Sequence, residues 1–222
     1  MYSSPNTSWT AADLRHMLSP GRFDRYAQAA GSRERAADLY LWNARISGAL
    51  HESLGAFEVI LRNALDRQLV AYHRIALSGD GRWYADPKMP WTSKKLADQI
   101  DRARAQATAN GRHPEVHGKV IAELTFGFWR YILAGQYQST LWAPALRRAF
   151  PHLGSQRRGD VYPLVDRLHS MRNRVAHHEP VHSLNIAARH KELLRISGWV
   201  DPAAAAWIGQ TSRISDVLAA RP

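Results

Sequence analysis

Residues 33–77, RERAADLYLWNARISGALHESLGAFEVILRNALDRQLVAYHRIAL, form a segment without proline. Its apolar side chains recur every three or four residues, which is the spacing of one face of an α-helix. The residues on this face are Leu39, Trp42, Ile46, Ala49, Leu50, Leu54, Phe57, Ile60, Leu61, Ala64, Leu65 and Leu69. The pattern predicts either one long helix or two helices divided near Gly48 or Gly55, because glycine weakens a helix.

Two shorter helices are expected before this segment. Thr10 and Asp13 have the spacing of a capping box, which predicts a helix that ends near Pro20. A second helix is expected over residues 23–30. Residues 1–9 carry no helical signal, so we expect them to form a flexible tail.

Six more helices are expected after the central segment, separated by prolines, glycines and capping residues. Their expected bounds are residues 92–109, 115–134, 136–150, 160–178, 183–198 and 201–220. We expect a kink or close helix packing at Gly127 and a bend or division at Pro144. No stretch shows the alternation that is typical of a β-strand. The sequence therefore predicts an all-α protein in which residues 10–222 form a single domain.

A loop over residues 78–91 carries three aromatic side chains, Trp83, Tyr84 and Trp91, among basic ones. Aromatic rings beside basic groups could stack on nucleic-acid bases. The favoured interpretation is that these rings fasten the loop to the core.

The composition favours an anionic partner. The chain has 222 residues and a formal net charge of +11, most of the positive charge being arginine. Arginine binds phosphate through two hydrogen bonds and stacks on bases, so nucleic acid is the obvious candidate. The alternative is that the charge only keeps the protein soluble.

The absence of cysteine excludes disulfides, thiolate zinc sites and cysteine nucleophiles, and it is compatible with a cytoplasmic protein. No apolar run reaches the length of a membrane span. The first residues do not combine a basic region with an apolar one, so no signal peptide is expected.

Residues 171–180, MRNRVAHHEP, hold the densest group of side chains able to bind or cleave a phosphodiester. On a helical wheel, one face of the preceding helix is apolar and the opposite face is polar. The apolar face comprises Val161, Leu164, Val165, Leu168, Met171 and Val175, and the polar face comprises Asp166, Ser170, Asn173 and His177. His177 is therefore expected to point to solvent, to a groove or to another subunit, whereas Arg172 lies near the margin of the apolar face.

A purely structural role would also account for this cluster, because cations at a helix C-terminus interact favourably with the helix dipole. A zinc site is not expected, because no His-Glu-x-x-His pattern is present and adjacent histidines point apart on a helix. Neither a phosphate-binding glycine loop nor a Gly-x-Ser-x-Gly elbow occurs, and no cofactor is expected. A helix-turn-helix in the last third of the chain is conceivable.

Three segments resemble the Abi-like family of abortive-infection proteins, which belongs to the HEPN superfamily. They are residues 43–65, residues 121–129 with Thr-Phe-Gly-Phe-Trp, and residues 172–180. The last segment contains Arg172 and His177 with the spacing of the Arg-x(4–6)-His motif of that superfamily. The resemblance covers roughly residues 30–200, and it implies a HEPN-like helical bundle with additional peripheral helices.

The resemblance implies a metal-independent RNA endonuclease that acts as a toxin or phage-defence effector. It implies a homodimer whose two motifs share a cleft, and an antitoxin protein or RNA as a further partner. His177 would transfer protons, and Arg172 would neutralise charge on the phosphate. Asn173 would position one of these two side chains. The products would carry a 2′,3′-cyclic phosphate and a 5′-hydroxyl.

Five further residues are possible auxiliaries of this site. Arg174 and His178 are four residues apart and could assist or replace the first pair. Glu58, Arg62 and Asn63 could line the same cleft, although bracing Arg172 is the favoured role. Two alternatives remain open: a HEPN module that binds RNA or a nucleotide without cleaving it, and a helical domain that binds protein partners.

Overall fold

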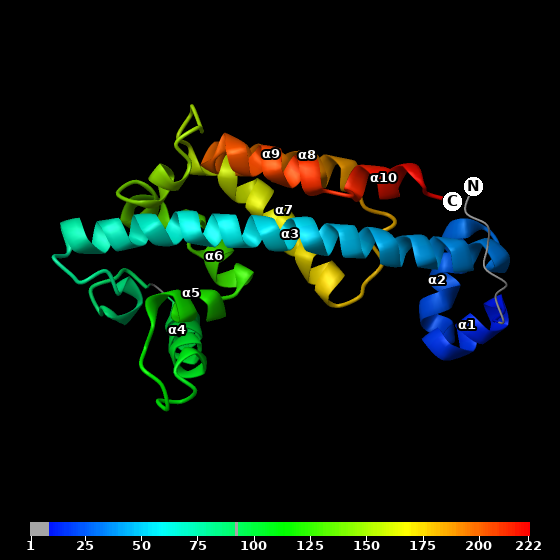
Figure 1. Cartoon of the computed structure of the whole chain (residues 1–222), viewed down its shortest axis with the longest axis horizontal. Helices are drawn as coiled ribbons and strands as arrows, with labels where there is room; N and C mark the ends of the chain where they lie inside the picture. The colour runs from blue at the N-terminus through cyan, green and yellow to red at the C-terminus, as the bar shows by residue number, and fades with distance from the viewer. Residues whose placement is uncertain (1–8, 92) are drawn as a thin grey trace.

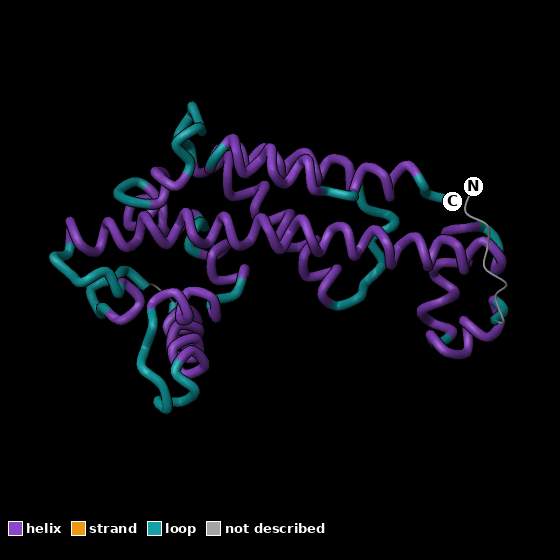
Figure 2. Tube along the Cα trace, in the orientation of Figure 1, coloured by secondary structure: helices purple, strands orange, loops and turns teal. Residues whose placement is uncertain are grey.

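The computed structural model describes residues 9–91 and 93–222, so Thr92 and nearly all of the expected tail lie outside the described part. Every regular element in that part is a helix and none is a strand, which confirms the all-α class (Figure 2). The α-helices are α1 (Ala11–Leu18), α2 (Pro20–Ala30), α3 (Arg33–Ala76), α4 (Lys94–Ala107), α5 (His117–Glu123), α6 (Phe126–Tyr131), α7 (Arg158–Ala176), α8 (Ile186–Val200), α9 (Pro202–Thr211) and α10 (Ile214–Ala219). Shorter elements are the 3₁₀-helices η1 (Trp83–Ala85), η2 (Gly135–Tyr137) and η4 (Leu146–Ala149) and the π-helix η3 (Gln138–Trp142).

The helix α3 runs the length of the molecule, and most other elements pack against it (Figure 1). It is a single helix of 44 residues, about 66 Å long at 1.5 Å per residue. In Figure 1, α8, α9 and α10 lie along one side of α3, α4 and α5 lie on the opposite side, and α1 and α2 cover its N-terminal end. The helix α7 packs against both α3 and α8.

Neither Gly48 nor Gly55 divides α3, so the expectation of one long helix holds and the break does not occur. Both glycines are on the exposed side, with open space beside them. A glycine inside a helix costs about 1 kcal/mol relative to alanine. The neighbouring Leu50 and Leu54 are each 1% exposed, and burying one leucine is worth roughly 1.5–3 kcal/mol. Packing of the buried face therefore outweighs the weakness of the two glycines.

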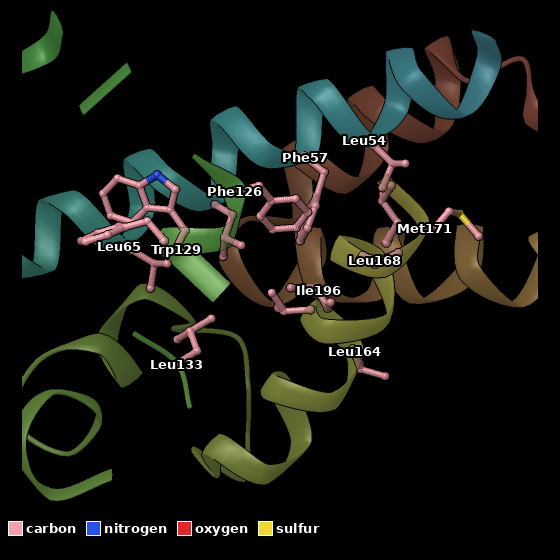
Figure 3. Close-up of a cluster of buried hydrophobic side chains, with 14 of the residues drawn as sticks. Leu54, Phe57, Leu65, Phe126, Trp129, Leu133, Leu164, Leu168, Met171 and Ile196 are labelled. Carbon is pink, nitrogen blue, oxygen red and sulfur yellow. The ribbon is translucent and has the colours of Figure 1, made fainter. Parts of the chain in front are cut away.

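The core lies where α3, α6, α7 and α8 meet (Figure 3). Phe57 of α3 and Phe126 of α6 pack edge to face, with ring centroids 6.0 Å apart. Leu168 and Met171 of α7 and Ile196 of α8 complete this region, and all three are at most 2% exposed. The predicted apolar face of α7 is therefore the face that the core buries.

The loop after α3 is fastened to the core by its aromatic side chains. Trp83 is fully buried and Tyr84 is 4% exposed. The indole nitrogen of Trp83 donates a hydrogen bond of 2.7 Å to Asp66 on α3. Trp91 packs edge to face on Trp83, with ring centroids 5.6 Å apart. The structural interpretation of these rings is confirmed for Trp83 and Tyr84.

Two of the expected helices are interrupted. The helix expected over residues 115–134 breaks at Thr125, not at Gly127, because the Thr125 hydroxyl accepts a hydrogen bond from the Phe128 amide and begins α6 as its N-cap. The helix expected over residues 136–150 is wrong as a regular α-helix. That segment consists of the short 3₁₀-helices η2 and η4 and the π-helix η3, and Pro144 lies between η3 and η4, where it cannot donate a backbone hydrogen bond.

Two helix boundaries also differ from the expected ones, and a third expected helix is divided. The helix α7 begins at Arg158 instead of Asp160, so Pro163 lies inside the helix, where it removes one backbone donor. The helix α8 is capped by Asn185, whose side chain accepts from the Ala188 amide, instead of by Ser183. The last expected helix is two helices, α9 and α10, and the joint between them contacts α3 through a hydrogen bond of 3.1 Å between the Ser53 and Ser212 hydroxyls.

A buried asparagine on α3 holds the loop that follows α7. Asn43 is 6% exposed, and its side-chain oxygen accepts hydrogen bonds from the backbone amides of Val181 at 2.8 Å and His182 at 3.1 Å. Val181 is itself fully buried. A single side chain thus joins the N-terminal part of the central helix to the chain directly after residues 171–180.

Replacing Asn43 by alanine is expected to lower the free energy of unfolding by about 2 kcal/mol, because it leaves a buried amide without a partner. Urea denaturation followed by circular dichroism measures this. Asn63→Ala, on the exposed side of the same helix, is the matched control and is expected to change the free energy by less than about 0.5 kcal/mol. Equal effects of the two substitutions would contradict this role of Asn43.

Candidate functional site

The polar cluster of residues 171–180 lies at the C-terminal end of α7 and in the turn after it. His177 is the residue that caps α7, and its amide donates to the Asn173 carbonyl at 2.9 Å. Its side chain is exposed, whereas Met171 and Val175 are buried. The wheel therefore predicted correctly that His177 points away from the core of its own subunit.

Arg172 leans from α7 toward the central helix. Its Nε atom lies 3.5 Å from a carboxylate oxygen of Glu58 on α3, with 38% of the arginine side chain and 17% of the glutamate side chain exposed. The bracing role favoured for Glu58 matches this contact. A step of five residues turns about 500° around the helix axis, which is one full turn plus about 140°. Arg172 and His177 therefore project about 140° apart and do not share a face.

Arg62 and Asn63 are the other two residues of α3 that were predicted as possible auxiliaries, and their surroundings differ. Arg62 is half-buried, and its Nε atom is buried without a hydrogen-bond partner among the described residues. It lies one helical turn after Glu58, on the side of α3 that approaches α7. Asn63 is exposed. Arg62 is thus placed near the Glu58–Arg172 contact, whereas Asn63 faces solvent.

Arg174 and His178 do not share a helical face, which corrects the expectation drawn from their spacing. The helix ends at Ala176, and His178 has a φ of 54°, in the left-handed region that commonly ends a helix. Arg174 pairs instead with Glu179, with 3.2 Å between Nε and a carboxylate oxygen. The carbonyl of His178 accepts a hydrogen bond from Arg22 on α2, which fastens the turn to the N-terminal helices.

A cavity of about 500 Å³ opens beside this turn, between α2, α3 and the end of α7. Its lining includes Tyr26, Tyr40, Asn43, His51 and His178, but most of its wall is apolar. Tyr26 and Tyr40 meet edge to face, with centroids 5.1 Å apart. The space therefore offers aromatic rings and two histidines within reach of the motif.

His169 is a neighbour of the motif that the sequence reasoning missed. Its Nε2 atom lies 3.4 Å from the side-chain nitrogen of Asn173, one turn further along α7. Its ring packs edge to face on Phe126, with centroids 5.4 Å apart. Burial lowers the pKa of His169, and the guanidinium groups of Arg130 and Arg172 lower it further against the opposing effect of Asp166. The spacing of four residues to Asn173 was the signal that could have identified it.

Three half-buried histidines are expected to make the fold sensitive to mild acid. Burial is the largest cause that lowers the pKa of each of His169, His182 and His190. The unfolded chain titrates these groups near their ordinary pKa of about 6.5, so below that pH it binds more protons than the folded chain does. Stability is therefore complete above about pH 6.5 and falls as the pH is lowered through the folded pKa values.

Urea denaturation at pH 7.5 and at pH 5.5 tests this expectation. The urea midpoint is expected to be lower at pH 5.5, and His190→Leu, which cannot gain a proton, is expected to reduce the difference. Carboxylates whose pKa values are lowered, such as Asp80 and Asp86, lose their charge only at more acidic pH and do not contribute in this window. Identical midpoints at the two pH values would show that the histidines are not held neutral by burial.

The fold and this surface define an all-α protein whose seventh α-helix ends in an exposed cluster of histidine and arginine. Over the described residues, no helix combines the length and the apolar character that a membrane crossing needs. No group of three His, Asp or Glu side chains within that part of the chain is arranged to hold a metal ion. No protein-family model, no curated protein and no solved structure matches the chain.

Proposed function

We propose that this protein is a metal-independent RNA endonuclease of the Abi-like, HEPN type, and that it acts in the cytoplasm as a toxin or phage-defence effector. One observation carries the proposal. His177 is turned out of its own core at the end of a helix that also carries Arg172 and Asn173. The formal net charge of +11 supports an anionic substrate, because many cationic side chains attract a polyphosphate strand.

The proposed chemistry needs no cofactor. A neutral imidazole such as that of His177 can remove the proton of the RNA 2′-hydroxyl, and the protonated imidazole can then give a proton to the leaving 5′-oxygen. The 2′-oxygen then bonds to phosphorus, and the bond from phosphorus to the 5′-oxygen breaks. Arg172 stabilises the charge that grows on the phosphate oxygens. Its contact with Glu58 uses Nε, and a guanidinium has two further nitrogens that can bind phosphate.

A homodimer is part of this proposal. Within one subunit, Arg172 leans on α3 and His177 faces outward, about 140° further around the helix. A second copy that presents the same surface would supply the opposing side of a cleft. His177 of one subunit could then act on a phosphate held by Arg172 of the other. An antitoxin protein or RNA would act by covering this surface.

Replacing His177 by alanine is expected to lower the rate of RNA cleavage by about a hundredfold or more, because proton transfer by a positioned side chain contributes that much. Purified protein is incubated with transfer RNA and messenger RNA in EDTA, and the product ends are identified. Wild-type protein is expected to leave 2′,3′-cyclic phosphates and no cleaved DNA, since DNA lacks the 2′-hydroxyl.

The matched control for this experiment is His152→Ala, another exposed histidine that lies outside the predicted set. It is expected to cleave at the wild-type rate. Undiminished cleavage by His177→Ala would show that the catalytic assignment is wrong.

The shared cleft gives a second prediction. Heterodimers of one Arg172→Ala subunit and one His177→Ala subunit, isolated with two different affinity tags, are expected to retain about half of the wild-type rate, because one of two composite sites keeps both residues. Each mutant homodimer is expected to be inactive. Inactive heterodimers would contradict a site built from both subunits and favour one contained in a single subunit.

A second candidate function is binding of RNA or a nucleotide without cleavage. It is favoured by the contact between Arg172 and Glu58, which engages part of the guanidinium that catalysis would use. Such a module would bind RNA with a strong dependence on salt and release no product. Product ends from wild-type protein in the EDTA assay would decide against it.

A further inference from the structure

A second cavity, of about 260 Å³, lies between α4, α6 and α7, on the other side of Asn173 from His177. Its polar lining comprises Lys95 and Gln99 of α4, Thr125 before α6, Arg130 and Tyr131 at the end of α6, and His169 of α7. The space is too small for a drug-sized ligand, for which cavities of roughly 300–1,000 Å³ are usual. A single phosphate or a small phosphate ester fits it better.

Positive charge predominates around this cavity. Arg130 pairs with Asp166 and donates a hydrogen bond of 3.2 Å to the Tyr162 hydroxyl, so its position is fixed by two partners. Lys95 is exposed at the rim. Burial is the largest cause that lowers the pKa of the His169 imidazole, and Arg130 lowers it more than Asp166 raises it. The lining carries two cationic side chains, Lys95 and Arg130, and the nearby acidic side chain is Asp166, so the balance of charge favours an anion.

Gly127 keeps the cavity open at the histidine. A Cβ atom at this position would lie 3.4 Å from Nε2 of His169 and 3.5 Å from the hydroxyl oxygen of Thr125. An alanine would therefore touch both polar groups, and a larger side chain would extend into the space between them. The kink considered at Gly127 does not occur, because the chain already breaks at Thr125, and this glycine instead lines the cavity close to His169.

We propose that the cavity between Lys95, Arg130 and His169 is a binding site for a phosphate group. Lys95 and Arg130 supply the charge, and the Thr125 hydroxyl and the Gln99 amide supply neutral hydrogen bonds. The phosphate belongs either to an RNA strand or to a free mononucleotide, and both offer the same oxygens to these donors. The site requires no cleavage activity, so it stands whether or not the protein is a ribonuclease.

The proposed phosphate-binding cavity is separate from the proposed catalytic site at His177, because the two lie far apart along α7. His169 and His177 are eight residues apart on one helix, about 12 Å along its axis. The two imidazoles therefore do not act on the same phosphate within one subunit. A strand bound at His177 that follows α7 toward its N-terminal end would place a neighbouring phosphate at the second cavity.

Binding is measured by isothermal titration calorimetry in the His177→Ala background, so that no RNA is consumed. The probes are inorganic phosphate, adenosine 5′-monophosphate and a 2′-O-methyl hexauridylate, which has no free 2′-hydroxyl. Lys95→Gln is expected to weaken binding of at least one probe by about fivefold, since an exposed charge-assisted hydrogen bond is lost. The matched control Lys94→Gln removes the same charge from the neighbouring exposed position and is expected to change binding by less than about twofold.

Filling the cavity provides a test that leaves every charge in place. Gly127→Leu is expected to weaken the same binding by more than about tenfold, because the side chain occupies the phosphate position. If this variant does not fold, as judged by circular dichroism, Gly127→Ala takes its place and is expected to weaken binding by about threefold.

The outcomes separate the sources of the phosphate. Effects of Lys95→Gln and the Gly127 variant on the hexauridylate alone assign the site to an RNA strand, and effects on the mononucleotide or on inorganic phosphate alone assign it to a free ligand. Equal effects of Lys95→Gln and Lys94→Gln, or binding unchanged by the folded Gly127 variant, would overturn the proposal. Cleavage by wild-type protein is measured separately in the EDTA assay. A negative result there would contradict the ribonuclease proposal but would leave the phosphate-binding proposal untouched.

Discussion

Burial of one face of α3 is the constraint on which the other elements depend. The helix is 44 residues long, and alone in water it would expose leucines, a tryptophan and a phenylalanine along one side. Helices α2, α6, α7, α8 and α10 all pack against it. A helix of this length gains its stability from such packing more than from its own propensity, which is why two exposed glycines do not divide it. The bundle therefore forms around α3.

The same helix also determines where the motif points. Asn43 fastens the chain after the motif, and Glu58 holds Arg172, so two residues of α3 about four turns apart fix the end of α7 from both sides. His177 is left outside this framework, beyond the last buried residue of α7. The arrangement keeps an arginine oriented and a histidine accessible, and this combination is what an enzyme or a binding module for phosphodiesters requires.

The polar residues of α7 have two different environments. His177 and His178 are in an exposed turn near an aromatic cavity, whereas His169 lines a smaller cavity bordered by Arg130. Asn173 bridges the two, because it is part of the motif and also contacts His169. Under the proposed function, a nucleic-acid strand that runs along α7 would meet both environments.

The all-α class, the buried face of α3 and the outward direction of His177 could be predicted from the sequence, because each depends on helical periodicity within one segment. Tertiary structure decided the rest. The contact of Arg172 with Glu58 and the bonds from Asn43 to Val181 and His182 join residues more than 100 positions apart, so no local pattern encodes them. The break at Thr125 and the interruption near Pro144 have local causes, an N-cap and a missing backbone donor. The cavity at His169 arises only where α4, α6 and α7 meet, because its lining side chains come from separate helices.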